Sequence, residues 1–282
     1  THENIKTIRP LKDGVIADFQ AAEEMIKGMI KMINTGSKFF KPSLRMVICI
    51  PSGITEVEKR AVRDSAEHAG AKEVYMIHEP MAAAIGMGID VEEPVGNMII
   101  DIGGGTSEIA VIALGGIVCD KSIRIAGDDF NANIEEYMRR QHNILIGERS
   151  AEQVKIEVGA AMTEIENPPA DFAVQGRDLM SGIPKEVFVS YVEIAHCLDK
   201  SIAKIEEAIL NALEMTPPEL AADIYRTGIY MAGGGSLLRG LDKRISLKTK
   251  LAVHVCEDPL RAVARGTGIA LKNVHKFPFL IK

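Results

Sequence analysis

Hydrophobic residues follow two spacings along the chain, and their alternation predicts an α/β protein. Short apolar runs, which are typical of buried strands, cover residues 44–50, 74–77, 98–100, 109–114, 229–231 and 252–256. Between them, apolar residues recur every three or four positions, as they do on one face of a helix. These segments predict helices over 19–33, 55–70, 190–214 and 260–274, and helices that begin near residues 80, 127, 150 and 237.

Short polar signals set the ends of several elements. Asp18 is placed to cap the first helix, and Thr55 with Glu58 forms a capping box, in which each side chain bonds the other residue's backbone N–H. Ser150 and Gln153 have the same spacing, so they predict that another helix opens at Ser150. Residues 167–189 instead carry prolines, glycines and short alternating runs, which predict a small β-rich subdomain.

The stretch 97–118, NMIIDIGGGTSEIAVIALGGIV, carries the strongest chemical signal. A buried strand ends at Asp101, a turn of Gly103, Gly104, Gly105 and Thr106 follows, and a second apolar strand returns. Glycines let a backbone approach a phosphate closely, and successive N–H groups in such a turn bind anions. Asp101 is a candidate ligand for hydrated Mg²⁺. From three glycines alone, a turn that binds no ligand is an equally good interpretation.

Glu79 is a second candidate for chemistry, because it follows the strand predicted at 74–77 and precedes Pro80. Pro80 suits the first turn of a helix, and ligands of open α/β sheets bind beyond the carboxyl ends of strands. Glu79 is therefore placed to orient or activate a water molecule. The alternative is a carboxylate that only complements the helix dipole, but the glycine turn close behind it favours the catalytic interpretation.

A second glycine cluster, Gly233 to Ser236, follows the strand predicted at 229–231 and precedes a helix. A nucleotide can lie against bare backbone in such a turn, although the pattern is neither a P-loop nor GxGxxG. Glu152 and Lys155 are three residues apart and share a helix face. They are candidates to hydrogen-bond a ribose or a base edge, but their spacing alone favours a solvated surface pair.

Length and composition narrow the class of protein. A chain of 282 residues is too long for one small core, which predicts two lobes. A formal net charge of −6 without a basic stripe gives no reason to expect a nucleic-acid partner. Cys49, Cys119, Cys197 and Cys256 are widely spaced and predict a reduced, cytoplasmic protein. No run has the length and purity of a membrane-spanning helix, and no signal peptide opens the chain.

Eight strings, spread over essentially the whole chain, resemble the MreB family of bacterial actins, within the superfamily of actin, heat-shock-chaperone and sugar-kinase ATPases. They are RPLKDGVIADF from Arg9, EPMAAAIG from Glu79, DIGGGTSE from Asp101, RIAGDDF from Arg124, LIGERSAEQVKIE from Leu145, TPPELAADI from Thr216, GGGSLLRGLD from Gly233 and EDPLRAVARGTG from Glu257. Together these strings are far more specific than either glycine turn alone.

The resemblance implies an actin-like (ribonuclease H-like) α/β fold of two lobes, with ATP and Mg²⁺ in the cleft between them. Lobe I would comprise residues 1–96, and residues 259–282 would return to it as a C-terminal helix. Lobe II would comprise residues 97–258, including a small β-rich subdomain at about 128–190.

The resemblance also assigns roles to the candidate residues. Asp101 would reach Mg²⁺ through water, and Glu79 would position the attacking water. The second phosphate loop would be Gly103, Gly104, Gly105 and Thr106. The helix beside the adenosine would contribute Ala151, Glu152, Gln153, Val154 and, as the partner of Glu152, Lys155. The adenosine-side glycine loop would be Gly233, Gly234, Gly235 and Ser236.

One departure from the family concerns its first phosphate loop, which is formed by a DxGT-type turn in an opening β-hairpin. No such turn precedes Thr1, and the only DxGxx(T/S) hairpin is the one at Asp101. The first strands of lobe I are therefore expected to be missing from the chain as given. Because phosphoryl transfer depends mostly on positioning, we expect weak nucleotide binding, reduced ATPase activity and an unpaired sheet edge.

The function that the resemblance implies is cytoskeletal. ATP would favour self-association into filaments on the inner face of the cytoplasmic membrane, where they organise the cell-wall elongation machinery and determine rod cell shape. Phe39 and Phe40, between Lys38 and Lys41, match a membrane-inserting pair of the family; the alternative is that both rings pack into the core. The alternative function is a solitary actin-fold ATPase or a sugar kinase, because one superfold hosts many functions.

Overall fold

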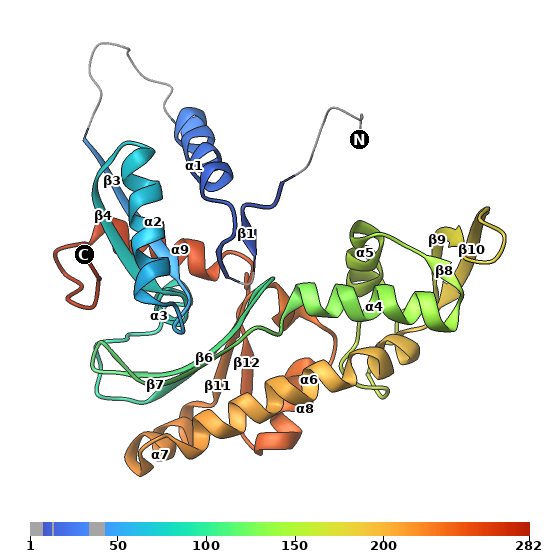
Figure 1. Ribbon diagram of the computed structural model, residues 1–282. Helices are drawn as coiled ribbons and strands as arrows, with labels where there is room; N and C mark the ends of the chain where they lie inside the picture. Colours follow the sequence, from blue (N-terminus) through green and yellow to red (C-terminus); the bar gives the residue numbers. More distant parts are fainter. Residues whose placement is uncertain (1–7, 13, 34–42) are drawn as a thin grey trace.

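A five-stranded mixed sheet and a two-stranded parallel sheet, with helices between them, form the framework of the protein (Figure 1). The computed structural model describes residues 8–12, 14–33 and 43–282. The strands are β1 (Leu11–Lys12), β2 (Val15–Ile16), β3 (Leu44–Ile50), β4 (Ala71–His78), β5 (Asn97–Ile102), β6 (Ser107–Ala113), β7 (Gly116–Ile123), β8 (Ile144–Leu145), β9 (Phe172–Asp178), β10 (Pro184–Val189), β11 (Ile229–Ala232) and β12 (Val253–Val255). The helices are α1 (Phe19–Ile33), α2 (Glu56–His68), α3 (Glu79–Gly86), α4 (Gly127–Gln141), α5 (Glu148–Val158), α6 (Tyr191–Glu214), α7 (Pro218–Thr227), the 3-10 turn η1 (Gly234–Leu237), α8 (Leu241–Thr249) and α9 (Ala262–Lys272).

The five-stranded sheet has the order β12-β11-β5-β6-β7. Its central strands β5 and β6 are buried along their whole length, which explains why their sequences are apolar at nearly every position. Alternate side chains face opposite sides of a strand. Ile100 accordingly packs into the cluster formed with α4, α5 and α6, whereas Ile99 packs into the cluster formed with α3 and α9.

The two-stranded sheet pairs β3 with β4 in parallel. Helix α2 packs on β4, and α1 packs on α2. The expected caps are confirmed at both helices. The backbone N–H of Ala21 donates to Asp18 Oδ1 at 3.0 Å, and Thr55 and Glu58 form the predicted reciprocal capping box.

Helices α3 and α9 cross at two glycines, and their contact joins the two sheets. A Cβ atom on Gly266 would lie 1.8 Å from the carbonyl oxygen of Ala82, and a Cβ on Gly86 would lie 1.8 Å from that of Ala262. The close crossing therefore requires a glycine at position 266. Gly268, on the same helix, has no such requirement, because a Cβ there would meet nothing within 4 Å.

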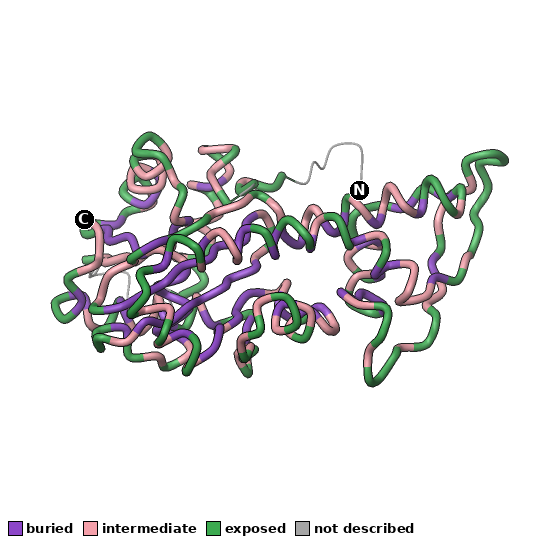
Figure 2. The backbone as a smooth tube through the Cα atoms, turned by 90° about the horizontal axis from the view of Figure 1, so that it is seen from below, coloured by how far each residue is buried: buried purple, intermediate pink, exposed green. Residues whose placement is uncertain are grey.

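The predicted β-rich segment forms a three-stranded antiparallel sheet, β10-β9-β8, next to α4 and α5. Buried positions concentrate where the larger sheets meet their helices, whereas β9 and β10 of this small sheet have one buried residue each (Figure 2). Within the described residues, no helix is long and apolar enough to cross a membrane.

Two predicted helix starts are wrong. Helix α5 begins at Glu148, not Ser150, because Gly147 is its N-cap and the N–H groups of Ser150 and Ala151 already bond to the Gly147 carbonyl. The helix predicted from Leu237 is only the turn η1 at that point. Gly240 adopts a left-handed conformation with φ of +75°, and α8 starts after it at Leu241.

Candidate functional site

The first glycine turn, residues 103–105, joins β5 to β6 and is fixed against the start of α4. The N–H of Gly103 bonds to the Thr106 carbonyl at 2.9 Å, which closes the turn. The N–H groups of Gly127 and Asp128 bond to the carbonyls of Gly103 and Gly104 at 3.1 and 2.8 Å. A Cβ on Gly104 would meet nothing nearer than the Asp128 carboxylate at 3.9 Å, so this position faces open space.

The second glycine turn, residues 233–236, packs against the end of β5, directly before the first turn. Gly233 has φ of +79°, and a Cβ there would lie 2.5 Å from Asp101 Oδ1 and 2.2 Å from the Ile102 carbonyl oxygen. Ser236 is buried and its hydroxyl donates to the Gly233 carbonyl at 2.7 Å, which stiffens the turn. The parallel pairing of β11 with β5, which sets Ala232 opposite Asp101, brings these distant segments together.

A cavity of about 460 Å³ opens between the two glycine turns, and we call it the nucleotide-side cavity. Its volume falls in the range of small-molecule sites. It brings together four predicted positions on the turns, Gly103, Gly104, Gly234 and Gly235, and two on α5, Glu152 and Lys155. Its other walls are Gly127, Asp128, Phe130, Ile156, Leu237, Leu238 and Leu260.

Only two of the five predicted residues on α5 line this cavity. Lys155 donates to Glu152 Oε2 at 2.7 Å and to the Gly127 carbonyl at 3.1 Å, so the pair is tied to the start of α4 and is not a free surface pair. Ala151 and Val154 are fully buried and support the helix from the core side. Gln153 is exposed and does not line the cavity.

Three carboxylates lie behind the first glycine turn, on the side of β5 and β6 that faces α3. Asp101 and Glu108 are paired across β5 and β6, and both are buried. Burial raises the pKa of Asp101 to about 7, and the charge of Glu108 acts in the same direction. Burial, followed by the charges of Asp101 and Glu108, raises the pKa of Glu79 to about 8. A carboxyl with such a pKa can exchange a proton near neutral pH.

This concentration of like charge fits a nearby cation. In the part of the chain that the structure describes, no group of three or more Asp, Glu, His or Cys side chains is arranged to hold a metal ion directly. A hydrated divalent cation that contacts Asp101 through water is consistent with both observations, because Mg²⁺ keeps several of its waters.

Glu108 is a functional candidate that sequence reasoning missed. It is 1% exposed and accepts hydrogen bonds from the Ser52 N–H at 3.0 Å and from the Ser122 hydroxyl at 2.6 Å. Ser52 follows β3 and Ser122 lies on β7, so Glu108 connects the two sheets. The available signal was a charged residue at the start of an otherwise apolar strand. Asp128, on the cavity wall and in an ion pair with Arg9, was missed as well.

The remaining predicted residues lie outside the cavity lining. Thr106 is buried, and its methyl group would lie 2.9 Å from a Cβ on Gly14. Gly105, Gly233 and Ser236 shape the turns without lining the cavity. Phe39 and Phe40, the predicted membrane contacts, lie outside the described residues.

Comparison with known proteins identifies relatives along the whole chain. The family described as MreB/Mbl protein matches residues 1–278. The cell shape-determining protein Mbl of Bacillus subtilis is 46% identical over 278 residues, which are 99% of this chain and 82% of that protein. The cell shape-determining protein MreB of Escherichia coli K12 is 48% identical over 274 residues, 97% of this chain and 78% of that protein.

Solved structures give the same result for the fold. MreB5 of Spiroplasma citri, crystallised with ADP, has a TM-score of 0.90 and 38% identity over 98% of this chain and 83% of that one. The double helical filament of MamK has a TM-score of 0.78 at 23% identity, over 95% of this chain and 81% of that one, which supports the fold alone. The fold is therefore actin-like, as predicted, and the chain belongs to the MreB/Mbl family.

Proposed function

We propose that the protein binds ATP with Mg²⁺ in the nucleotide-side cavity and assembles with copies of itself into filaments. The observation that carries the proposal is the cavity that both glycine turns line, together with the buried Asp101 and Glu108 and the half-buried Glu79 behind the first turn. Two structures of MreB5 of Spiroplasma citri, with ADP and with AMPPNP, support nucleotide as the ligand.

Each part of the site has a distinct task in this proposal. The bare backbone at Gly104 approaches a phosphate, and Gly234 lies on the opposite wall beside the adenosine. Glu152 and Lys155, held by their mutual ion pair, offer an acceptor and a donor to the sugar or the base. Bound Mg²⁺ would neutralise phosphate charge and, beside Asp101, would lower the pKa values of the buried carboxylates.

Glu79 acts as the base that orients and deprotonates the attacking water. It begins α3 directly after β4, and its carboxylate is held near Asp101 and Glu108 by the fold. Burial, followed by the charges of these neighbours, raises its pKa to about 8, so its proton affinity is high enough to receive a proton from water.

Filament formation on a membrane is the proposed cellular role. Relatives named as cell shape-determining proteins support a cytoskeletal function. A head-to-tail contact that does not close on itself generates an open filament. The sequence Lys38-Phe39-Phe40-Lys41 supplies two aromatic rings and two cations suited to an anionic membrane surface, where cell-wall elongation machinery would be organised.

Sedimentation of the purified protein with Mg-ATP, with Mg-ADP and without nucleotide tests the proposal, alongside an assay for sugar phosphorylation. We expect pelleted polymer that depends on nucleotide, and no phosphorylated sugar. Addition of anionic vesicles should carry the wild type into the lipid fraction, whereas Phe39→Ser with Phe40→Ser should remain unbound. Phosphorylated sugar in the absence of polymer would replace the filament proposal with a sugar kinase.

A further inference from the structure

Glu108 on β6 is a buried acid that does not line the nucleotide-side cavity. Its carboxylate accepts hydrogen bonds from the Ser52 N–H at 3.0 Å and from the Ser122 hydroxyl at 2.6 Å. Within the described residues, no lysine, arginine or histidine pairs with it. A carboxylate that is buried without a cation costs folding free energy, and an apolar side chain would stabilise the position better. The acid therefore points to a role other than stability.

Glu108 belongs to a row of paired residues on one face of the five-stranded sheet. It is directly opposite Asp101 of β5 and directly opposite Ser122 of β7. Residues that are paired in this way share a face, and their Cβ atoms lie about 4.5–5.5 Å apart. Glu108 is therefore an immediate neighbour of Asp101, which the proposed function places beside Mg²⁺.

The Ser52 N–H, in contrast, belongs to the two-stranded sheet. Ile50, the last residue of β3, is paired with His78, the residue before Glu79. Because β3 and β4 are parallel, Ser52 and Glu79 follow these strands at the same end of the sheet. The hydrogen bond from Ser52 to Glu108 holds that end of the sheet against β6.

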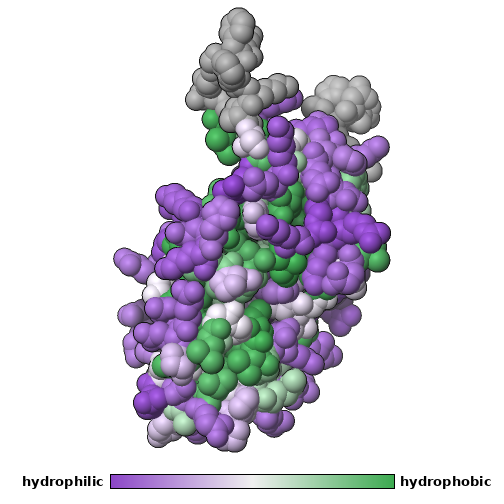
Figure 3. All heavy atoms as spheres, turned by 90° about the vertical axis from the view of Figure 1, so that its left-hand side faces the viewer, coloured by the Kyte–Doolittle hydropathy of each residue, from purple (hydrophilic) through white to green (hydrophobic). Residues whose placement is uncertain are grey.

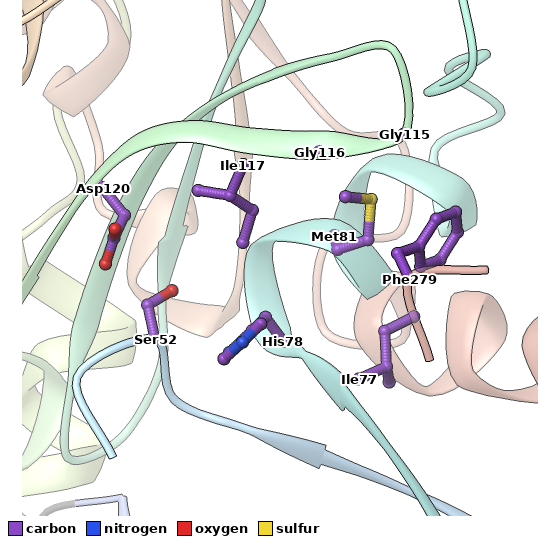
Figure 4. A pocket seen from close by; sticks show the side chains of 9 residues that line it. All are labelled: Ser52, Ile77, His78, Met81, Gly115, Gly116, Ile117, Asp120 and Phe279. Atoms are coloured by element: carbon purple, nitrogen blue, oxygen red, sulfur yellow. The ribbon is translucent and has the colours of Figure 1, made fainter. Parts of the chain in front are cut away.

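The loop that follows β3 also lies close to β7. A Cβ atom on Gly53 would lie 3.1 Å from Ser122 Cβ. Figure 4 shows Ser52 of this loop and Asp120 of β7 at one end of a cavity of about 270 Å³. Beyond them the cavity separates the start of α3 from the β6–β7 turn, so the two sheets are not closely packed there. The contact at Glu108 is therefore well placed to set their spacing.

Apolar packing forms another part of this junction. Ile77 and Met81 lie in the same cluster as Ile99 and Ala110 of the five-stranded sheet. Seen from the side where the C-terminus and the β6–β7 turn lie, hydrophobic atoms gather along the middle of the surface between hydrophilic borders (Figure 3). Apolar packing is non-directional, whereas hydrogen bonds to a carboxylate are short and add geometric specificity.

We propose that Glu108 is a positioning residue for ATP hydrolysis, which sets the distance between Glu79 and Asp101. Its carboxylate stands beside Asp101 and holds, through Ser52, the sheet end that carries Glu79. The water molecule at Glu79 and the cation beside Asp101 are thereby kept in place relative to each other. A displacement of about 1 Å can slow a reaction about 100-fold. The inference rests on the proposed function, in which Glu79 orients that water.

Two conservative substitutions separate the position of the side chain from its charge. Glu108→Gln removes the charge and keeps the length: the amide oxygen accepts from the Ser52 N–H, and the NH₂ group donates to the Ser122 hydroxyl, which can accept as well as donate. Glu108→Asp keeps the charge but is one methylene group shorter, so it cannot reach both partners unless a strand moves. We expect Glu108→Gln to keep the turnover number of ATP hydrolysis within about 3-fold and Glu108→Asp to lower it about 10- to 100-fold.

Phosphate release under saturating ATP gives the turnover number, and calorimetric titration gives the affinity for ATP. Both variants should bind ATP within about 3-fold of the wild type, because Glu108 does not line the nucleotide-side cavity. Polymer pelleted in parallel separates a loss of hydrolysis from a loss of assembly. Glu164→Asp makes the same change on an exposed loop residue and should keep the wild-type turnover.

Equal turnover in Glu108→Gln and Glu108→Asp, or a larger loss in Glu108→Gln, would overturn the inference. So would a loss of ATP affinity in Glu108→Asp as large as its loss of turnover, because a residue that only maintains the fold would produce it. If Glu79→Gln lowers turnover while the two Glu108 variants remain equal, this inference fails and the proposed function stands. A wild type that does not hydrolyse ATP, or unchanged turnover in Glu79→Gln, would reject the proposed role of Glu79 and this inference with it.

Discussion

At the scale of single residues, the buried carboxylates are the most costly feature of the site. Asp101 and Glu108 are cross-strand neighbours, and like charges in that arrangement destabilise a sheet. Glu79 adds a third carboxylate to the same region. A buried carboxyl group either stays protonated or needs a nearby cation. The stability of the nucleotide-free protein should therefore depend on pH.

The stability of the nucleotide-free protein should fall as pH rises from about 5 to about 8. The pKa of Glu79 is raised from 4.5 to about 8 and that of Asp101 from 3.8 to about 7, so in this window the folded state holds protons that the unfolded state has lost. Stability falls with pH wherever the folded state binds more protons. Thermal unfolding in matched buffers measures the effect.

Glu79→Gln should flatten that decline, because an amide cannot lose the proton. Glu164→Gln, on an exposed loop residue, is the matched control and should keep the wild-type slope. A Glu79→Gln variant whose melting temperature declines as steeply as the wild type would show that Glu79 is not the titrating group.

The same substitution tests catalysis. If Glu79 takes the proton of the attacking water, Glu79→Gln should lower the turnover number of ATP hydrolysis by roughly 10²–10⁴-fold while ATP still binds. Phosphate release measured under saturating ATP gives the turnover number. Unchanged turnover would leave Glu79 with only its interaction with the α3 dipole.

At the scale of elements, the two glycine turns differ in how much space surrounds them. Gly104 faces open space, so Gly104→Val should fold normally and weaken ATP binding by about 10-fold or more, because the side chain occupies the place of a phosphate. Gly235 has no such room, because a Cβ there would lie 2.2 Å from Ile102 Cγ2. Gly235→Val should therefore lower the melting temperature. Circular dichroism and a titration with ATP separate the two outcomes, and wild-type affinity in folded Gly104→Val would mean that the turn does not contact nucleotide.

The crossing of α3 and α9 gives a second test at this scale. Gly266 of α9 lies at the crossing, and Gly268 on the same helix serves as the control. Gly266→Ala would set a methyl group 1.8 Å from the Ala82 carbonyl, so it should destabilise the protein by about 1–3 kcal/mol or more. Gly268→Ala meets nothing within 4 Å and should stabilise the helix by up to about 1 kcal/mol. Denaturant unfolding measures both. Equal effects of the two substitutions would contradict the close crossing.

The elements that could be predicted from sequence are those with strong local signals. The apolar runs were sufficient to predict β5 and β6, and the caps at Asp18 and Thr55 were sufficient to predict where α1 and α2 begin. Each of these signals depends only on neighbouring residues. The start of α5 was predicted wrongly, because Ser150 mimics a cap while Gly147 performs that task. A charge at the start of an apolar strand marked Glu108, but its role could not be predicted, because its partners Ser52 and Ser122 lie at a distance in sequence.

At the scale of the whole molecule, function depends on segments that the fold brings together. Both glycine turns and Glu152 could be predicted as site residues from the sequence. That Gly233 lies against Asp101 follows only from the parallel pairing of β11 with β5. The cavity between the start of α3 and the β6–β7 turn likewise needs the return of the C-terminal segment to β4, a contact without a local signal. The chain spans 82% of the length of Mbl of Bacillus subtilis, and both glycine turns lie within the matched residues.

Photolabelling with 8-azido-ATP, followed by mass spectrometry of the modified peptides, tests most directly whether the nucleotide lies between these turns. The account predicts a saturable label within residues 148–158 or 233–241, which unmodified ATP removes by competition. A competed label confined to other parts of the chain, or no competed label while ATP binding is saturated, would contradict it.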